Sequence, residues 1–414
     1  MKNLKIDAER LWDDLMQTAR IGGTAKGGIC RLTLTETDRE VRDWFKAAAE
    51  KLGCAVTVDD MGTMFARYPG QRSDVAPIAM GSHLDTQPTG GKFDGVLAAL
   101  EALRAMVRAG YQTFAPIEVI NWTNEEGARF APSMLASGVF AGVFKRDWAA
   151  ARTDRGGESF GAALEQIGYR GPEPCGGHKL SAFFELHIEQ GPYLETEGKD
   201  IGVVTGMQAM RWCEMTVTGR ESHAGTTPMA RRADALLGAA RMIEFVNACA
   251  RQFPEAVGTV GLMEVKPGSP NVIPGEVFFT LDLRNPDAAV VDRMEREFTA
   301  AAARIAGELG LQTEFKPVSA EPAVVFDKSC VAAVRAAAKV SGFSSRDIIS
   351  RAGHDAAYVA RVAPAAMIFV PCKDGISHNE TEYSSKEQCA AGAQVLLHAV
   401  LDYDRQLAER LGGR

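Results

Sequence analysis

Residues 81–95 read GSHLDTQPTGGKFDG and place His83, Asp85 and Asp94 in one short loop that turns at a Gly-Gly pair. The apolar residues before this loop predict the end of a buried strand, and residues 96–103 after it predict a helix. In an open α/β sheet, a loop between a buried strand and a helix is the usual position of an active site. Imidazole and carboxylate side chains together suit zinc, manganese or a similar divalent ion. The alternative is a polar loop whose acids stabilise the start of the next helix.

The composition indicates a soluble globular protein without nucleic-acid or membrane partners. The chain has 414 residues, which predicts two domains, with 46% hydrophobic and 24% charged residues. Its net charge is −7 and it has no basic cluster interleaved with aromatic residues, so nucleic-acid binding is not expected. No apolar run is long enough to cross a bilayer, and the N-terminal segment predicts an amphipathic helix rather than a signal peptide. The 8 cysteines form no CxxC pair, which predicts reduced thiols in a cytoplasmic protein.

A second predicted strand, at residues 116–123, runs directly into Glu125 and Glu126. Adjacent glutamates at a strand end point in different directions, so one can bind a metal while the other stays free as a base. The alternative is a helix start that attracts acids through the helix dipole. Beside a His/Asp loop from a neighbouring strand, the metal-site interpretation is favoured.

Two histidines accompany further predicted strands. Residues 181–190 read SAFFELHIEQ and place His187 on the same strand face as two glutamates. His378 lies in Ser-His-Asn-Glu, just after a strand predicted at residues 365–370. A lone histidine in a strand is more often a satisfied polar residue than a ligand. The metal interpretation of each histidine therefore depends on the neighbouring loops.

Two local patterns concern helix starts. Residues 157–161 match G-x-S-x-G, which in a serine hydrolase places the nucleophile on a sharp turn after a buried strand. The residues before this match are polar, so we predict that Ser159 caps a helix at residues 162–167 instead. Thr37 and Glu40 predict a capping box at the start of an earlier helix.

The pattern of strands and helices changes at residue 212 and changes back after residue 325. Between these positions the predicted order is β-α-β-β-α-β, the ferredoxin-like split motif. We therefore predict an α/β protein whose catalytic domain comprises residues 1–211 and 326–414, with residues 212–325 as an inserted domain. The open sheet of the insert would offer an edge strand and helices for a two-fold contact between subunits.

The motifs at these loops resemble those of the dinuclear metallo-amidases and peptidases related to carboxypeptidase G and aminoacylase. The nearer resemblance is to their carbamoylase branch, which comprises N-carbamoyl-amino-acid hydrolases, β-ureidopropionases and allantoate amidohydrolases. It covers nearly the whole chain, and its motifs are GSHLDTQPTGGKFDG, NEEGARF, HIEQG, ESHAGTTPM, NVIPGE, AGHDA and SHNE. The resemblance implies a zinc-peptidase-like α/β/α catalytic domain with a mixed sheet, an inserted dimerisation domain, and two divalent ions per subunit. Zinc or manganese is the implied metal, with cobalt and nickel as alternatives.

The resemblance also implies which residues bind the two metal ions. His83 and His187 would hold one ion. Glu126 and His378 would hold the other, and Asp94 would bridge the two. Two ions that share a carboxylate can lower the pKa of a water between them toward neutrality.

Catalytic roles are implied for three further residues. Glu125 would be the general base, a role that suits a glutamate with a raised pKa. Asp85 would orient His83, as metal-bound histidines usually require. His223, in the ESHAGTTP loop of the insert, would donate a hydrogen bond to the tetrahedral oxyanion and would reach the site of the partner subunit.

The resemblance implies substrate contacts at Gln190, Asn271, Arg284, Gly353 and His354. Asn271 and Arg284 would bind a substrate carboxylate, since arginine is suited to bidentate carboxylate recognition. The alternative for Arg284 is a charge at the surface end of a strand. Gln190 and the Gly353 amide would contact the carbamoyl and carboxylate ends, with His354 as an additional contact.

We therefore expect a cytoplasmic, homodimeric, two-metal amidohydrolase. It would cleave the N-carbamoyl group of an N-carbamoyl amino acid, of the L-α or β-alanine type, to the amino acid, carbon dioxide and ammonia. The alternatives are an allantoate or ureide amidohydrolase and, less favoured, a dipeptidase or aminoacylase. A binding protein that has lost the chemistry is a further alternative, which the complete set of implied ligands together with Glu125 argues against.

Overall fold

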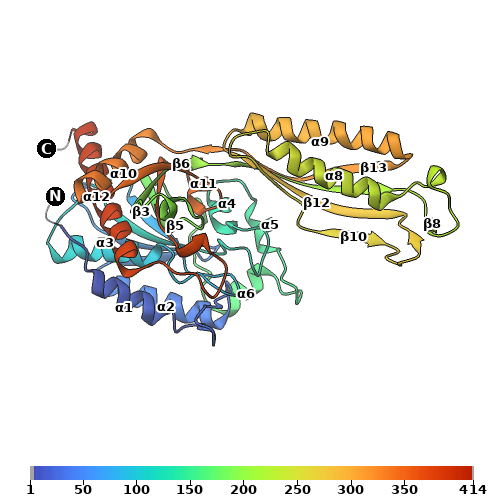
Figure 1. The fold of residues 1–414 in the computed structure, drawn as a ribbon. Coiled ribbons are helices and arrows are strands. Elements are labelled where there is room, and N and C mark those ends of the chain that lie inside the picture. The colour runs from blue at the N-terminus through green and yellow to red at the C-terminus, as the bar shows by residue number, and fades with distance from the viewer. Residues whose placement is uncertain (1–3, 413–414) are drawn as a thin grey trace. The chain divides into compact units, whose positions relative to one another are not determined.

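The chain forms two compact units in the computed structural model, which describes residues 4–412 (Figure 1). The first unit comprises Met1–Gly206 and Val325–Arg414, and the second comprises Met207–Val324. The pattern of strands and helices predicted that the insert starts at residue 212. The second unit starts earlier because its first strand, β7 (Ala209–Thr218), already begins at Ala209.

A nine-stranded mixed sheet forms the centre of the first unit. Its order is β1 (Ala55–Val58), β2 (Met64–Tyr68), β4 (Ile117–Trp122), β3 (Ile78–His83), β5 (Ala182–Ile188), β16 (Ala365–Val370), β6 (Ile201–Met207) and β14 (Val324–Val325), with β15 (Ser345–Ser350) paired to β6. The neighbours among β4, β3, β5 and β16 are parallel, whereas β2 and β6 pair antiparallel with β4 and β16. The mixed α/β sheet expected from the sequence is confirmed.

The central strands are covered on both faces. Every residue of β3, β4, β5 and β16 is buried, which is typical of parallel strands between layers of helices. Helices α3 (Val96–Arg108) and α10 (Lys328–Ser341) both pack against α12 (Lys386–Arg410) and against the sheet, and α11 (Asp355–Val359) packs against β5, β16 and α4 (Leu135–Phe140). The remaining described helices of this unit are α1 (Ala8–Thr18), α2 (Glu36–Lys51), α5 (Arg146–Ala150), α6 (Phe160–Gln166), α7 (Tyr193–Thr196) and the 3-10 turn η2 (Lys373–Gly375).

Two helix starts test the local sequence patterns. Helix α6 has Ser159 as its N-cap, and the Ser159 hydroxyl accepts a hydrogen bond from the Ala162 amide. The G-x-S-x-G match is therefore a helix cap, as predicted. Helix α2 has Thr35 as its N-cap. The capping box predicted at Thr37 and Glu40 is wrong, because Thr35 already caps the first turn two residues earlier.

A buried ion pair within α2 contacts the segment between β4 and Glu125. Asp38 and Arg42 lie one helical turn apart with both side chains fully buried and their charged atoms 2.8 Å apart. Arg42 also donates to the Gly62 carbonyl at 2.8 Å and to the Thr123 hydroxyl at 3.2 Å. We expect Arg42→Ala to lower the free energy of unfolding by about 3–5 kcal/mol, because it leaves a buried carboxylate without its partner. Denaturant titration measures this change.

The matched control for this prediction is Arg39→Ala on the same helix. Arg39 forms an ion pair with Glu36 at the surface, where such pairs contribute little to stability. A similar loss of stability in both variants would contradict the assignment of a stabilising buried network to Arg42.

The second unit is an antiparallel sheet with the β-α-β-β-α-β order expected from the sequence. In chain order its elements are β7, α8 (Ala235–Ala250), β9 (Val257–Thr259), β10 (Met263–Lys266), β12 (Glu276–Asn285), α9 (Ala288–Leu309) and β13 (Gln312–Glu321). The sheet order is β10-β12-β7-β13, with β9 beside β12, so the second strand of the motif is split into β9 and β10. Separately, β8 (Ser222–His223) pairs with β11 (Val272–Ile273), and the 3-10 turn η1 (Met229–Arg231) follows β8.

Helices α8 and α9 supply the core of the second unit together with one face of its sheet. Strand β12 alternates half-buried and buried residues along its length, the period-two pattern of a sheet with one packed face. Phe279 on β12 packs against Phe298 on α9 with ring centroids 6.4 Å apart. The insert thus has a hydrophobic core of its own.

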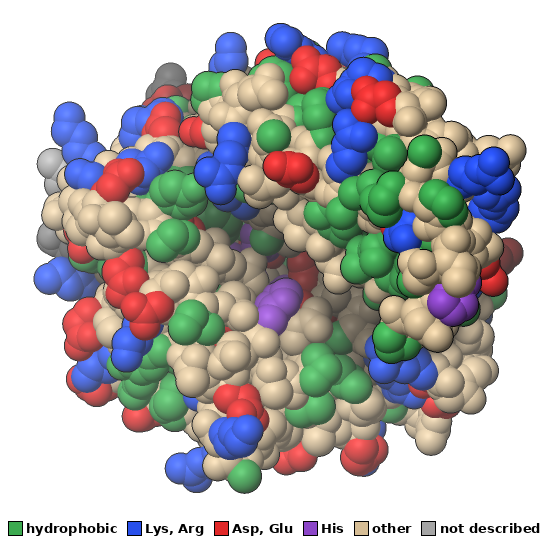
Figure 2. All heavy atoms as spheres, turned by 45° about the vertical axis from the view of Figure 1, so that its right-hand side comes forward, with side chains coloured by type: hydrophobic (Ala, Val, Ile, Leu, Met, Phe, Trp, Pro, Cys, Tyr) green, Lys and Arg blue, Asp and Glu red, His purple; other side chains and the backbone are tan. Residues whose placement is uncertain are grey.

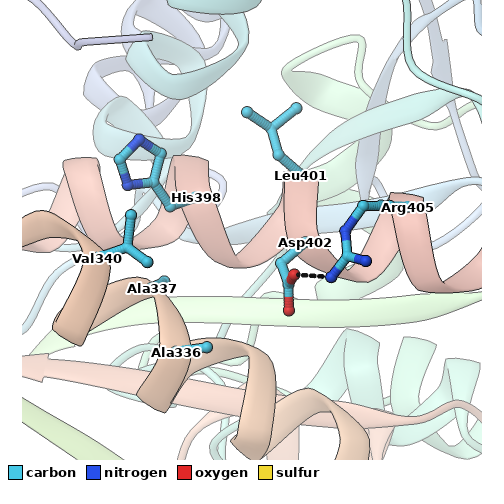
Figure 3. A pocket seen from close by; sticks show the side chains of 7 residues that line it. All are labelled: Ala336, Ala337, Val340, His398, Leu401, Asp402 and Arg405. Atoms are coloured by element: carbon cyan, nitrogen blue, oxygen red, sulfur yellow. Dashed lines mark hydrogen bonds and ion pairs between the residues drawn. The ribbon is translucent and has the colours of Figure 1, made fainter. Parts of the chain in front are cut away.

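The surface carries no extended charged patch on the face that Figure 2 shows, where Lys and Arg side chains are interspersed with Asp and Glu among the described residues. Within residues 4–412, no helix is both long and apolar enough to cross a membrane. A groove of about 170 Å³ lies between α10 and α12, lined by residues that include Val340, His398 and Leu401 (Figure 3). None of its lining residues is among the predicted site residues.

Candidate metal centre

The implied metal ligands lie at neighbouring strand ends of the first unit. His83 ends β3, Glu126 follows β4, His187 lies near the end of β5, and His378 follows β16. These strands are adjacent in the order β4-β3-β5-β16 and run parallel to their neighbours. Because the carboxyl ends of parallel strands meet at one edge of a sheet, residues distant in the sequence come together there.

Asp94 lies between two histidine rings. Its Oδ1 is 3.1 Å from His187 Nε2, and its Oδ2 is 3.9 Å from His83 Nε2. The two rings are stacked with 5.8 Å between centroids, and all three side chains are buried. Ligand atoms of the three residues lie within 4.8 Å of one another, so this group can hold a metal ion.

His83 also belongs to a second group, with Glu125 and Glu126. Their ligand atoms again lie within 4.8 Å of one another, and His83 Nε2 is 3.4 Å from Glu125 Oε2. His378 extends this group, since its Nε2 is 3.6 Å from Glu126 Oε2. The structure therefore brings every implied ligand next to another one, with His83 common to both groups.

The Nε2 atoms of the buried His83 and His187 rings face carboxylates of the cluster. His83 Nδ1 is 2.8 Å from the Asp85 carbonyl oxygen, and His187 Nδ1 is 2.9 Å from the Ile188 carbonyl oxygen. A carbonyl only accepts, so in the neutral ring Nδ1 carries the proton and Nε2 is unprotonated. Among residues 4–412, the buried His83 Nε2 has no hydrogen-bond partner. A lone pair that faces carboxylates needs a proton or a metal ion between them, and this set of imidazoles and carboxylates fits zinc or manganese.

The acids of the cluster shift its ionisation. Burial by itself lowers the pKa of His83, but the charges of Glu125, Asp94 and Asp85 outweigh it and raise that pKa well above its ordinary value. Burial raises the pKa of Glu125 well above its ordinary value, and His83 offsets part of the rise. Burial likewise raises the pKa of Asp85 to about 6. Without a cation, the cluster therefore retains protons at neutral pH.

Metal binding should release protons for this reason. A divalent ion competes with a proton for His83 Nε2, so we expect a net release of about one proton or more per chain at pH 7, and an affinity that increases as pH rises toward the raised pKa of His83. Isothermal titration calorimetry in buffers of different ionisation enthalpy measures the number of protons. A binding enthalpy that is the same in every buffer would contradict the prediction.

The Asp85 carboxylate organises the loop that carries the two glutamates. Its Oδ1 and Oδ2 accept hydrogen bonds from the Glu125 and Glu126 amides, each at 3.3 Å. It lies 4.0 Å from His83 Nδ1, whereas the Asp85 carbonyl oxygen makes the short contact to that nitrogen. The residue expected to orient His83 through its carboxylate therefore does so in this structure through its backbone, because two loop amides occupy the carboxylate.

Gln87 hydrogen-bonds to Glu126. It was not among the site residues predicted from the sequence. Its Nε2 donates to Glu126 Oε2 at 3.0 Å and to the Glu126 carbonyl at 3.2 Å, and its amide donates to Glu126 Oε1 at 3.2 Å. These bonds orient the carboxylate that faces His378. The only available signal was the position of Gln87 inside the GSHLDTQPTGG motif, since a glutamine carries no chemistry that a pattern would single out.

Three of the residues expected to contact substrate lie in the first unit. Gln190 donates from Nε2 to Ser377 Oγ at 2.9 Å. The His354 ring is buried with its centroid 4.5 Å from that of His187, and neither of its nitrogens has a hydrogen-bond partner among the described residues. Burial and the neighbouring histidines lower the pKa of His354 well below its ordinary value, so the ring is neutral. Gly353 precedes it, and a Cβ at Gly353 would lie only 2.9 Å from a methionine side chain.

His223 and Asn271 lie next to each other in the second unit. Strand β8 pairs with β11, and the Ala224 amide donates to the Asn271 carbonyl at 2.9 Å. His223 Nδ1 accepts hydrogen bonds from the Gly225 and Thr226 amides at 3.0 Å and 3.2 Å. The neutral ring therefore carries its proton on Nε2, which is the tautomer that a hydrogen-bond donor requires.

Arg284 lies near the end of β12 and binds Asp282 on the same strand. Its Nε is 2.8 Å from Asp282 Oδ1 and its Nη2 is 2.7 Å from Asp282 Oδ2. This bidentate pairing is the geometry with which arginine recognises a carboxylate. The guanidinium is half-buried rather than a solvated charge, since the Arg284 side chain is 26% exposed.

The family model described as peptidase family M20/M25/M40 matches residues 79–402, a range that includes every implied metal ligand. The chain belongs to this family. Among curated relatives, the N-carbamoyl-L-amino-acid amidohydrolase of Rhizobium meliloti is 51% identical over 405 residues, which cover 97% of each chain. The N-carbamoyl-L-amino acid amidohydrolase of Geobacillus stearothermophilus is 37% identical over 402 residues, which cover 95% of this chain and 98% of the relative.

A solved structure is similar to this chain over nearly its whole length. An amidase of the hydantoinase/carbamoylase family from Burkholderia multivorans matches with a TM-score of 0.92 and 54% identity, covering 96% of this chain and 98% of that chain. The chain thus falls in the hydantoinase/carbamoylase branch, as the resemblance of its motifs implied.

Proposed function

We propose that the protein is a metal-dependent N-carbamoyl-L-amino-acid amidohydrolase. It would hydrolyse the linear amide of an N-carbamoyl amino acid with one water, giving the amino acid, carbon dioxide and ammonia. The observation that carries this proposal is the cluster of His83, Asp94, His187, Glu125 and Glu126, in a chain that is similar over nearly its whole length to enzymes with that name.

Two divalent ions, zinc or manganese, are the proposed cofactors. His83 and His187 would hold one ion, Glu126 and His378 would hold the other, and Asp94 would lie between the two. Bound there, the ions would polarise the substrate carbonyl and lower the pKa of the attacking water. The support in this chain is the pair of Nε2 lone pairs that face opposite oxygens of Asp94.

Glu125 is the proposed general base. Its neighbour Glu126 already faces His378 and Gln87, which leaves Glu125 as the glutamate for proton transfer. Burial raises the pKa of Glu125. A raised pKa suits a carboxylate that takes a proton from water and returns it to the leaving nitrogen.

Residues of the second unit would complete the site. His223 would donate from Nε2 to the oxyanion that forms when water adds to the carbonyl, and its tautomer supports this role. Asn271 and Arg284 would bind the substrate carboxylate. That carboxylate would replace Asp282 as the partner of the Arg284 guanidinium.

We also propose a homodimer formed through the second unit, in which His223 serves the site of the partner subunit. The sheet of this unit ends in β13, an edge strand of 10 residues that are mostly exposed. Edge strands with unpaired backbone groups are natural sites for two-fold pairing between copies of one chain.

Subunit exchange between two inactive variants should restore activity. We expect His223→Ala and Glu125→Gln each to be nearly inactive as homodimers. In a mixed dimer, one site combines the intact Glu125 of one chain with the intact His223 of the other, so random mixing should return roughly a quarter of wild-type activity. Native mass spectrometry of tagged chains confirms the exchange. If activity stays absent after exchange, His223 acts in its own subunit's site or outside the chemistry.

An ammonia-release assay tests the proposed function. Metal-depleted enzyme reconstituted with zinc or manganese is supplied with several N-carbamoyl-L-amino acids, N-carbamoyl-β-alanine and allantoate, and release of free amino acid from dipeptides and N-acetyl amino acids is measured beside them. We expect the fastest turnover with an N-carbamoyl-L-amino acid and none without metal. Faster turnover of allantoate, of the β-alanine derivative or of a dipeptide would contradict the proposed substrate class.

A further inference from the structure

Glu382 is a buried carboxylate outside the implied ligand set, with 4% of the residue exposed. Its Oε1 accepts a hydrogen bond from the Gly91 amide at 2.9 Å. Its Oε2 accepts from Ser377 Oγ at 2.9 Å and from the His378 amide at 3.2 Å. One carboxylate thus joins the loop that carries Asp94 to the loop that carries His378.

A third loop reaches Glu382 through Ser377. Gln190, which follows β5, donates from Nε2 to Ser377 Oγ at 2.9 Å, and that hydroxyl donates in turn to Glu382. The loops after β3, β5 and β16 therefore converge on one side chain. Gly91 and Glu382 are 291 residues apart in the sequence.

The backbone at this junction is closely packed and strained. Gly90 has φ of +117°, and a Cβ there would lie 3.2 Å from the Asn379 nitrogen and 3.3 Å from His378 Cα. His378 has φ of 55°, in the left-handed region that is unfavourable for residues other than glycine. Such a conformation persists only where the surroundings hold it. Here Glu382 binds the His378 amide, and the Thr89 hydroxyl donates to the His378 carbonyl at 3.3 Å.

The His378 ring depends on this backbone for its position. Its side chain is 52% exposed, whereas the Glu126 side chain opposite is 9% exposed. Apart from Gln190, whose Nε2 lies 3.5 Å from His378 Nε2, little packing surrounds the exposed ring, so the position of Nε2 depends strongly on the backbone from which the side chain extends. Contacts that hold that backbone therefore influence the distance between His378 and Glu126.

We propose that Glu382 is a positioning residue for the second metal ion, which sets His378 opposite Glu126 and ties its loop to the one that carries Asp94. The inference rests on the proposed metal site. Both Glu382 oxygens accept hydrogen bonds from the loops, and the role proposed for this side chain is to act through His378 rather than as a ligand of the ion. Losing an outer contact of this kind typically lowers metal affinity by about 10–100-fold.

Calorimetric titration of metal-depleted protein with Zn²⁺ or Mn²⁺ tests this role. The wild type should bind two equivalents. Glu382→Gln keeps the size of the side chain but cannot accept from both loops, so it should bind the first equivalent like the wild type and the second at least about tenfold more weakly. Ser377→Ala removes one of the contacts and leaves Glu382 in place, so it should weaken the same equivalent by a smaller factor.

Glu380→Ala is the matched control. It removes an acid from the same loop, and the hydrogen bond and ion pair of Glu380 go to Thr24 and Lys26 rather than to the partners of Glu382. It should therefore bind both equivalents like the wild type. Thermal unfolding of each variant checks that it is folded, and if Glu382→Gln does not fold, Ser377→Ala decides the matter.

The inference would be overturned by a wild type that binds one equivalent, by an unchanged second equivalent in Glu382→Gln and Ser377→Ala, or by equal weakening of both equivalents. The readout is metal binding and not activity. A wild type that binds two ions and releases no ammonia would therefore contradict the proposed function, while the role of Glu382 would still be supported by the variants.

Discussion

Replacement of Glu125 by glutamine should leave both metal equivalents bound and lower turnover at least about a hundredfold, the typical contribution of a positioned general base. The amide keeps the shape of the side chain but cannot take a proton from water. Glu125 lies within the cluster, 3.4 Å from His83 Nε2, yet the contacts to Gln87 and His378 are made by Glu126. Elemental analysis of the purified variant and its rate of ammonia release are the two measurements.

Glu126→Gln is the matched control for Glu125→Gln, because it makes the same chemical change at the next position. We expect that variant to lose metal as well as activity, since Glu126 faces His378 across 3.6 Å. Near-normal turnover in a fully metal-loaded Glu125→Gln protein would exclude Glu125 as the base. Loss of metal from the Glu125→Gln protein would indicate that Glu125 is a metal ligand.

Asp94→Asn should lower the occupancy of both metal sites together and abolish most of the activity. Asp94 presents one oxygen to His187 at 3.1 Å and the other to His83 at 3.9 Å. An amide keeps one oxygen but loses the negative charge, which would otherwise neutralise two cations held close together. Metal content after dialysis against buffer with a weak chelator, measured beside the wild type, gives the occupancy.

His378→Ala is the contrasting variant for Asp94→Asn. It removes a ligand from the second site only, so one equivalent should remain on His83, Asp94 and His187. Two full equivalents in Asp94→Asn would show that the bridging assignment is wrong. Two full metal equivalents in His378→Ala would show that His378 is not a ligand.

Local patterns in the sequence were sufficient for the class of the fold. Short stretches of sequence predicted the apolar strands, and the structure confirms them as β3, β4, β5 and β16. The changed order of predicted strands and helices in the insert corresponds to a separate antiparallel sheet. Local context was also sufficient to assign Ser159 to a helix cap. The one failed local pattern is the capping box at Thr37. Thr35 and Thr37 are both candidate caps, and only the structure shows that Thr35 caps the helix.

The sequence also indicated which residue types form the candidate site. His83, Asp94, Glu126, His187 and His378 all follow or end buried strands, and parallel strands gather such residues at one edge. A histidine or a carboxylate carries recognisable chemistry wherever it stands. Residue types therefore indicated the candidates, and the resemblance of their motifs implied which of them bind each ion.

Only the tertiary structure decided how these residues are held. The Asp85 carboxylate binds the Glu125 and Glu126 amides and leaves the His83 ring to a carbonyl. Glu382 joins loops that are 291 residues apart. Hydrogen bonds of this kind depend on which strands become neighbours and on distances of a few tenths of an ångström. The Asp85 carboxylate and the Glu125 amide are 40 residues apart, and Glu382 and the Gly91 amide are 291 residues apart. No short stretch contains both partners of these bonds, so the sequence specifies them only through the complete fold.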